Sequence, residues 1–143
     1  MIPDYLASEL TRLTLEHVVL VVVALLIAAA VAIPAGVGLT RRPGARRWAL
    51  GFASVVQTIP SLALFGFLIP VPFIGGIGRN TAIIALVLYA LLPLLRNTIV
   101  GITGVDPAVR ESALALGMTG RQLFWKVELP LAVPTIVAGV RIA

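Results

Sequence analysis

The feature that most constrains this chain is an uncharged, strongly apolar stretch of 22 residues, Val18 to Leu39. As an α-helix it would be about 33 Å long, since each residue adds about 1.5 Å. That length crosses the hydrocarbon core of a bilayer, which is about 30 Å thick. Over the whole chain of 143 residues, 59% are hydrophobic and 12% are charged, whereas a soluble domain carries about a quarter charged residues. The sequence therefore predicts an all-α, polytopic transmembrane helical bundle.

Two more apolar segments, 48–69 and 81–102, have the length and composition of spans. A last apolar run, 131–143, is too short to cross a membrane and is interpreted as the start of a further span. We therefore expect residues 1–143 to form one transmembrane domain that is incomplete at its C-terminus. The more polar segment 103–130 is expected to form two short helices at the membrane surface.

Basic residues are distributed unevenly between the expected loops. Eight lie on the side of the first loop and of segment 103–130: Arg41, Arg42, Arg46, Arg47, Arg96, Arg110, Arg121 and Lys126. The opposite side has Arg12 and Arg79, with Arg141 left out because it lies within the last apolar run. The positive-inside rule then places segment 103–130 in the cytoplasm and the N-terminus outside. We expect a multi-pass protein of a bacterial or archaeal plasma membrane, in contact with lipid, whose net charge of +5 is a topology signal and not a nucleic-acid-binding surface.

Several kinds of chemistry have no support in the sequence. There is no cysteine, and the single histidine, His17, cannot form a metal cluster alone. The phosphate-binding pattern GxxxxGK[ST] is absent, because the one lysine, Lys126, is followed by Val127. We expect a non-catalytic chain that binds no cofactor itself.

The start of the polar segment has clear helix signals. Asp106 can cap a helix whose first residue is Pro107, and it stands four residues before Arg110, a favourable spacing for an ion pair. Val109, Ala113 and Leu116 form an apolar stripe that can rest on the spans. Gly117 and Gly120 are expected to break this helix, and a second helix over 121–128 is expected to end at Leu129-Pro130.

The spacing within this segment resembles the EAA loop of binding-protein-dependent ABC importer permeases. Glu111-Ser112-Ala113 is followed after three residues by Gly117, and after nine more by Val127, with Leu129 and Pro130 completing the motif. Ser112 and Val127 replace the Ala and Ile of the family pattern. Periodicity alone also allows an amphipathic loop that only completes the packing.

The resemblance implies a coupling helix that sits in a cleft of an ATP-binding partner subunit. By this similarity Glu111 would contact the ATPase, Ala113 would allow close approach, and Gly117 would permit a sharp turn. Leu129 and Pro130 would set the exit into the next span. ATP would be bound and hydrolysed by the partner, and transport would proceed by alternating access.

Three further blocks, Gln57–Ala63, Ala90–Thr98 and Gly104–Pro107, resemble the osmoprotectant permeases of glycine betaine, carnitine and choline importers. The resemblance implies a MetI-like permease of a type I ABC importer. It also implies an extracytoplasmic substrate-binding protein and a second permease chain, alike or related. An amino acid or another small solute is the alternative cargo, and a channel or assembly subunit without ATP coupling is the alternative from another class.

Polar side chains within the spans are costly unless they face protein or a water-filled path. The candidates for a translocation path are Gln57, Thr58, Ser61 and Asn97, together with Pro60, which is expected to bend its helix. These polar groups can equally form hydrogen bonds between helices without lining a path, and the bend at Pro60 can serve packing alone. Aromatic residues are too scattered to indicate a cation–π cage, so capture of a quaternary amine is assigned to the binding protein.

Overall fold

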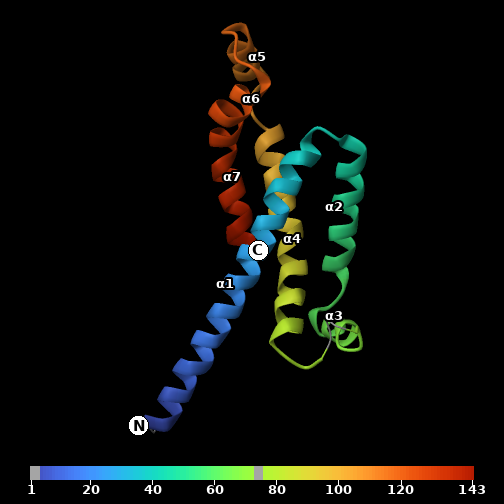
Figure 1. The fold of residues 1–143 in the computed structure, drawn as a ribbon, viewed down its shortest axis with the longest axis vertical. Coiled ribbons are helices and arrows are strands. Elements are labelled where there is room, and N and C mark those ends of the chain that lie inside the picture. The colour runs from blue at the N-terminus through green and yellow to red at the C-terminus, as the bar shows by residue number, and fades with distance from the viewer. Residues whose placement is uncertain (1–3, 73–75) are drawn as a thin grey trace.

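The computed structural model describes residues 4–72 and 76–143, and all of its regular elements in these ranges are helices (Figure 1). In chain order they are α1 (Asp4–Thr40), α2 (Pro43–Thr58), α3 (Ser61–Leu68), α4 (Arg79–Thr103), α5 (Pro107–Ala115), α6 (Gly120–Leu123), the π-helix η1 (Phe124–Glu128) and α7 (Leu129–Ile142). The all-α architecture predicted from the sequence is confirmed.

Within the described residues, three helical runs are long and apolar enough to cross a membrane. They are Ser8–Thr40, Arg79–Thr103 and Gly120–Ile142, and the bent pair α2 and α3 adds a fourth pass if it counts as one span. The first run includes the uncharged stretch that begins at Val18 and extends it toward the N-terminus. The N-terminal part of α1 leaves the other helices and projects beyond them (Figure 1).

Helix α4 is the centre of the molecule, because α1, α2, α3 and α7 all pack against it. The side of α1 that faces α4 has small residues at four-residue intervals, namely Ala24, Ala28, Ala32 and Gly36, and all are buried. Such small residues let helix backbones approach closely, which is how spans associate in lipid, where there is no hydrophobic drive between helices.

Two glycines mark the closest approaches. A Cβ atom on Gly36 would lie 2.8 Å from the side chain of Thr98, which is fully buried on α4. A Cβ atom on Gly139 of α7 would lie 2.7 Å from Cβ of Asn97 and 3.1 Å from the carbonyl oxygen of Pro93. The packing of α4 on both neighbouring helices therefore depends on the absence of a side chain at these positions.

The segment expected as a second span over 48–69 is two helices that meet at an angle of 101°. Ile59 has an extended backbone (φ −77°, ψ 124°), as the residue before a proline prefers, and Pro60 then begins the turn into α3. The break is fastened to α4, because Nε2 of Gln57 donates to the carbonyl of Tyr89 at 3.0 Å and the Tyr89 hydroxyl donates to the carbonyl of Ile59. Pro60 is thus the site of a sharp corner.

The last helical run differs from the expectation that Leu129-Pro130 would end a short helix over 121–128. Helices α6, η1 and α7 follow one another without a break from Gly120 to Ile142. The wide π turn provides the reason: Leu129 N–H donates to the carbonyl of Phe124, five residues earlier. A π turn directly before Pro130 accommodates a ring that would otherwise clash with the preceding turn of a regular α-helix.

Candidate functional site

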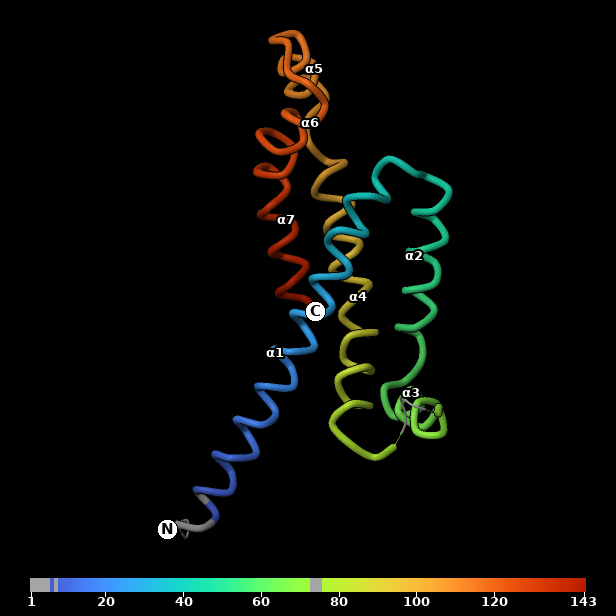
Figure 2. Tube along the Cα trace, in the orientation of Figure 1, coloured from blue at the N-terminus to red at the C-terminus, as the bar shows by residue number. Residues whose placement is uncertain are grey.

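Helix α5 lies at one end of the molecule, beyond the ends of the longer helices. The connection between α1 and α2 is at the same end, and the N-terminus lies at the opposite end (Figure 2). Within the described chain, α5 packs mainly against α6 and η1, and over a small area. Most of its surface is therefore open to a partner.

The start of α5 follows the sequence signals closely. An oxygen of the Asp106 carboxylate accepts a hydrogen bond from the backbone N–H of Ala108 at 2.8 Å, and Pro107 is the first helical residue. The carboxylate also interacts favourably with the positive end of the helix dipole. The beginning of the helix is thereby fixed at Pro107.

The end of α5 is a Schellman turn around Gly117. Gly117 has φ +82°, its N–H donates to the carbonyl of Leu114 at 2.9 Å, and the N–H of Met118 donates to the carbonyl of Ala113 at 3.2 Å. This pairing satisfies two carbonyls at the helix end and reverses the chain direction. The next helix starts with a capping box, in which Thr119 and Gln122 each accept from the other's backbone N–H.

The outer surface of α5 combines a carboxylate with apolar side chains. Glu111 and Ser112 are exposed, and the Ser112 hydroxyl donates to the carbonyl of Ala108. Of the apolar stripe that was expected to rest on the spans, Ala113 alone is buried, whereas Val109 is 41% and Leu116 is 81% exposed. That part of the prediction is wrong, because α5 extends past the bundle and has few side chains beneath it.

The remaining motif residues lie on the run that returns to the bundle. Val127 is half-buried in η1, Leu129 is half-buried at the start of α7, and Pro130 follows it with its ring exposed. Because α5 contacts η1, the two halves of the motif are brought together in space. Their part in coupling to an ATPase stays a prediction.

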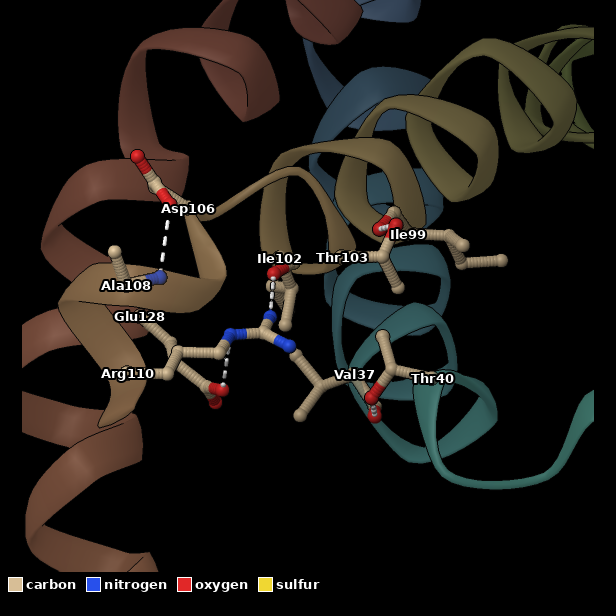
Figure 3. A network of polar contacts seen from close by, with 9 residues as sticks. All are labelled: Val37, Thr40, Ile99, Ile102, Thr103, Asp106, Ala108, Arg110 and Glu128. Carbon is tan, nitrogen blue, oxygen red and sulfur yellow. Dashed lines mark hydrogen bonds and ion pairs between the residues drawn. The ribbon is translucent and has the colours of Figure 1, made fainter. Parts of the chain in front are cut away.

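Arg110 connects α5 to two other elements (Figure 3). Its Nε lies 3.1 Å from Oε1 of Glu128, and its Nη2 donates to the carbonyl of Ile102 near the end of α4. The sequence indicated Asp106 as the partner of Arg110, but Asp106 is occupied in capping α5. The pair with Glu128 was missed because it joins residues 18 positions apart, and only their opposite charges could have suggested it.

A cavity of about 650 Å³ lies beside α4. Its lining combines polar groups with aliphatic ones and comes from α2, α4 and the end of the chain: Gln57, Tyr89, Leu92, Pro93, Arg96, Asn97, Val100, Ile142 and Ala143. The cavity therefore joins two of the candidate path residues, Gln57 and Asn97. It adds Tyr89 and Arg96, which are not among the path candidates predicted from the sequence.

The other path candidates lie outside this lining. The Thr58 hydroxyl donates to the carbonyl of Val55 in its own helix, Pro60 caps α3, and Ser61 is the first residue of that helix. Asn97 and Gln57 also make hydrogen bonds, to the carbonyls of Pro93 and Tyr89. Both are thus structural contacts as well as cavity-lining groups.

The described residues contain no cluster of three or more His, Asp or Glu side chains that could hold a metal ion. The three carboxylates near α5 have different environments: Asp106 caps a helix, Glu128 pairs with Arg110, and Glu111 is exposed. The arrangement offers an exposed helix and a cavity with a lining of mixed polar and apolar side chains.

Comparison with protein families gives one match that covers most of the chain. Residues 24–143 match the family described as binding-protein-dependent transport system inner membrane component. The matched region includes the packed part of α1, the cavity and the whole of α5 to α7.

Comparison with curated proteins gives relatives with more than 40% identity. The chain is 45% identical to the carnitine transport permease protein OpuCB of Listeria monocytogenes, over 91% of this chain and 58% of the relative. It is 44% identical to the glycine betaine/carnitine/choline transport system permease protein OpuCB of Bacillus subtilis, over 94% and 60%. It is 43% identical to the choline transport system permease protein OpuBB of the same organism, also over 94% and 60%. The chain thus spans about three fifths of the length of these relatives.

Proposed function

The chain belongs to the family of binding-protein-dependent transport system inner membrane components, and on that premise we propose that it acts in an ATP-driven importer. Its role there is that of the membrane-spanning permease, and the cargo is a quaternary-amine osmoprotectant such as glycine betaine, carnitine or choline. The named activities of the relatives, which carry carnitine, choline or glycine betaine, support this cargo. The alternating-access cycle takes its energy from ATP bound by a partner subunit.

The observation that carries the proposal is the exposed helix α5. It presents Glu111 next to apolar side chains, of which Leu114 is 51% and Leu116 is 81% exposed. Apolar groups gathered at the polar end of a membrane protein favour a protein partner over water. Seating of α5 in a cleft of the ATP-binding subunit would cover them.

The remaining partners follow from the same premise. A separate or fused extracytoplasmic binding protein delivers the cargo, because the described path residues form no aromatic cage. A second permease chain, identical or related, completes the path, for which the cavity beside Gln57 and Asn97 supplies one wall. The end with α5 faces the cytoplasm and the N-terminus lies outside.

The proposal is tested by reconstituting the full-length permease in liposomes with its ATPase and binding protein. We expect accumulation of labelled glycine betaine with ATP and none with a non-hydrolysable analogue. Glu111→Lys should abolish uptake while the protein remains inserted, because it places a cation where the partner meets a carboxylate. Glu16→Lys is the matched control, since it makes the same charge change on an exposed residue at the opposite end of the molecule.

Each alternative has its own outcome in this assay. Uptake that proceeds without any ATPase would establish a channel. ATP-dependent uptake of a labelled amino acid, with no uptake of labelled glycine betaine, choline or carnitine, would establish the other class of cargo. Either result would overturn the proposed function.

A further inference from the structure

Arg110 joins three elements through one side chain. It belongs to α5, its guanidinium pairs with Glu128 of η1, and it donates to the carbonyl of Ile102 on α4 (Figure 3). The Arg110 side chain is 31% exposed and that of Glu128 is 14% exposed, so the contact is largely shielded from water. A surface ion pair contributes little, whereas a shielded one is costly to separate.

The chemistry of the three groups makes them interdependent. The last carbonyls of an α-helix have no partner within the helix, and a cation near them also interacts favourably with the helix dipole. Arg110 supplies such a cation to the end of α4, and Glu128 neutralises its charge. Removing either side chain leaves a shielded charge or carbonyl without its partner.

Other connections between α5 and the spans are few. The apolar side chains of Val109 and Leu116 point outward, and Ala113 contributes only a methyl group to the packing. Short connections before Pro107 and after Ala115 complete the attachment. The Arg110 side chain is therefore the main polar contact between α5 and α4. Through Glu128 of η1 it also connects α5 to α7, which follows η1 directly.

We propose that Arg110 is a positioning residue that makes α5 move as one body with α4 and α7. This inference rests on the proposed function, because it concerns how motion of an ATPase reaches the spans. Without the link, the partner can still grip α5 and hydrolyse ATP, but α5 moves relative to the spans. ATP is then consumed without a matching amount of transport.

The test measures uptake and ATP hydrolysis together in liposomes that contain the full-length permease, its ATPase and its binding protein. The readout is the number of substrate molecules imported per ATP hydrolysed. We expect Arg110→Gln and Glu128→Gln each to lower this ratio by about fivefold or more, at the low end of typical coupling between sites. The double variant should fall no further than Arg110→Gln alone, because that change already removes the contact with Glu128.

The matched control is Arg47→Gln, which removes one exposed positive charge at the same end of the molecule. Arg47 makes no ion pair within the described part of the chain, so the ratio should not change. A merely structural role for Arg110 would reduce uptake and hydrolysis in proportion and leave the ratio constant. A constant ratio therefore overturns the inference.

Two other results are also decisive. If Arg110→Gln fails to assemble, Glu128→Gln decides, because it leaves Arg110 bonded to Ile102: a lowered ratio supports the inference and an unchanged ratio overturns it. Absence of ATP-dependent uptake in the unmodified protein overturns the proposed function, and the inference with it. Transport by the unmodified protein therefore distinguishes failure of the proposed function from failure of the inference about Arg110.

Discussion

Gly117 sets the geometry of the candidate docking helix through its backbone alone. It has φ +82°, and a Cβ atom there would meet nothing within 4 Å. Substitution is therefore a test of left-handed backbone strain, uncomplicated by a clash. For a residue with a Cβ atom this conformation costs roughly 1–2 kcal/mol.

We expect Gly117→Ala to loosen the Schellman turn by that amount. The amide of Met118, which donates to Ala113, should then exchange its hydrogen about 5- to 30-fold faster, as the cost predicts. Hydrogen–deuterium exchange of the reconstituted protein, followed by mass spectrometry of peptides that contain Met118, measures this effect.

Gly117→Asn is the control, because asparagine adopts the left-handed conformation more readily than alanine. Its exchange should lie between those of the glycine and alanine proteins. Equal exchange in all three proteins would show that the turn does not depend on the backbone preference of residue 117.

At the residue scale, local signals were predictable from the sequence and distant pairings were not. Asp106 caps α5 and Gly117 ends it, as their residue types and spacing indicate. The local spacing pairs Arg110 with Asp106, the carboxylate four residues earlier. Its contact with Glu128 depends on how the chain returns after Gly117, which no local spacing specifies.

At the scale of elements, the packing of α1 on α4 gives a matched pair of glycines. Gly36 faces Thr98, where a Cβ atom would lie 2.8 Å away, whereas Gly38 has nothing within 4 Å. Both lie within α1. Alanine favours a helix over glycine by about 1 kcal/mol when nothing opposes it.

The two substitutions should therefore act in opposite directions. We expect Gly36→Ala to lower the thermal midpoint of the detergent-solubilised protein, because α1 and α4 must separate around the fully buried Thr98. Gly38→Ala should leave it unchanged or raise it. A thermal-shift series on both variants measures the difference, and equal midpoints would contradict the close contact.

The elements themselves were predictable to different degrees. The apolar runs predicted helices in the right places, because hydrophobicity and length are local properties. The effects of the prolines on the helices were harder to predict from the sequence. Pro60 produces a corner of 101°, while Pro130 does not interrupt its helix, because η1 provides a wide turn directly before it. Whether a proline ends or only modifies a helix depends on neighbouring hydrogen bonds and packing.

At the scale of the whole molecule, the fold gathers positive charge at one end. The connection between α1 and α2, which together with the start of α2 holds four arginines, lies at the same end as α5, and the N-terminus lies at the other (Figure 1). Positive loops are retained in the cytoplasm. On this rule we expect the end with α5 to be the one that an intracellular ATPase would reach.

This topology is directly testable because the chain contains no cysteine, so each introduced thiol is the only target of a maleimide reagent. Leu116→Cys places an exposed thiol on the segment that links α5 to α6, and Asn80→Cys places one at the start of α4, at the opposite end. In intact cells that produce the permease without its ATPase, which would otherwise cover residue 116, a membrane-impermeant maleimide should label Asn80→Cys alone. It should reach Leu116→Cys only after the membrane is permeabilised, because the positively charged end of the molecule, which includes α5, is expected to stay in the cytoplasm. The unmodified protein should remain unlabelled, and labelling of Leu116→Cys from outside the cell would contradict both this orientation and the docking of an ATPase on α5.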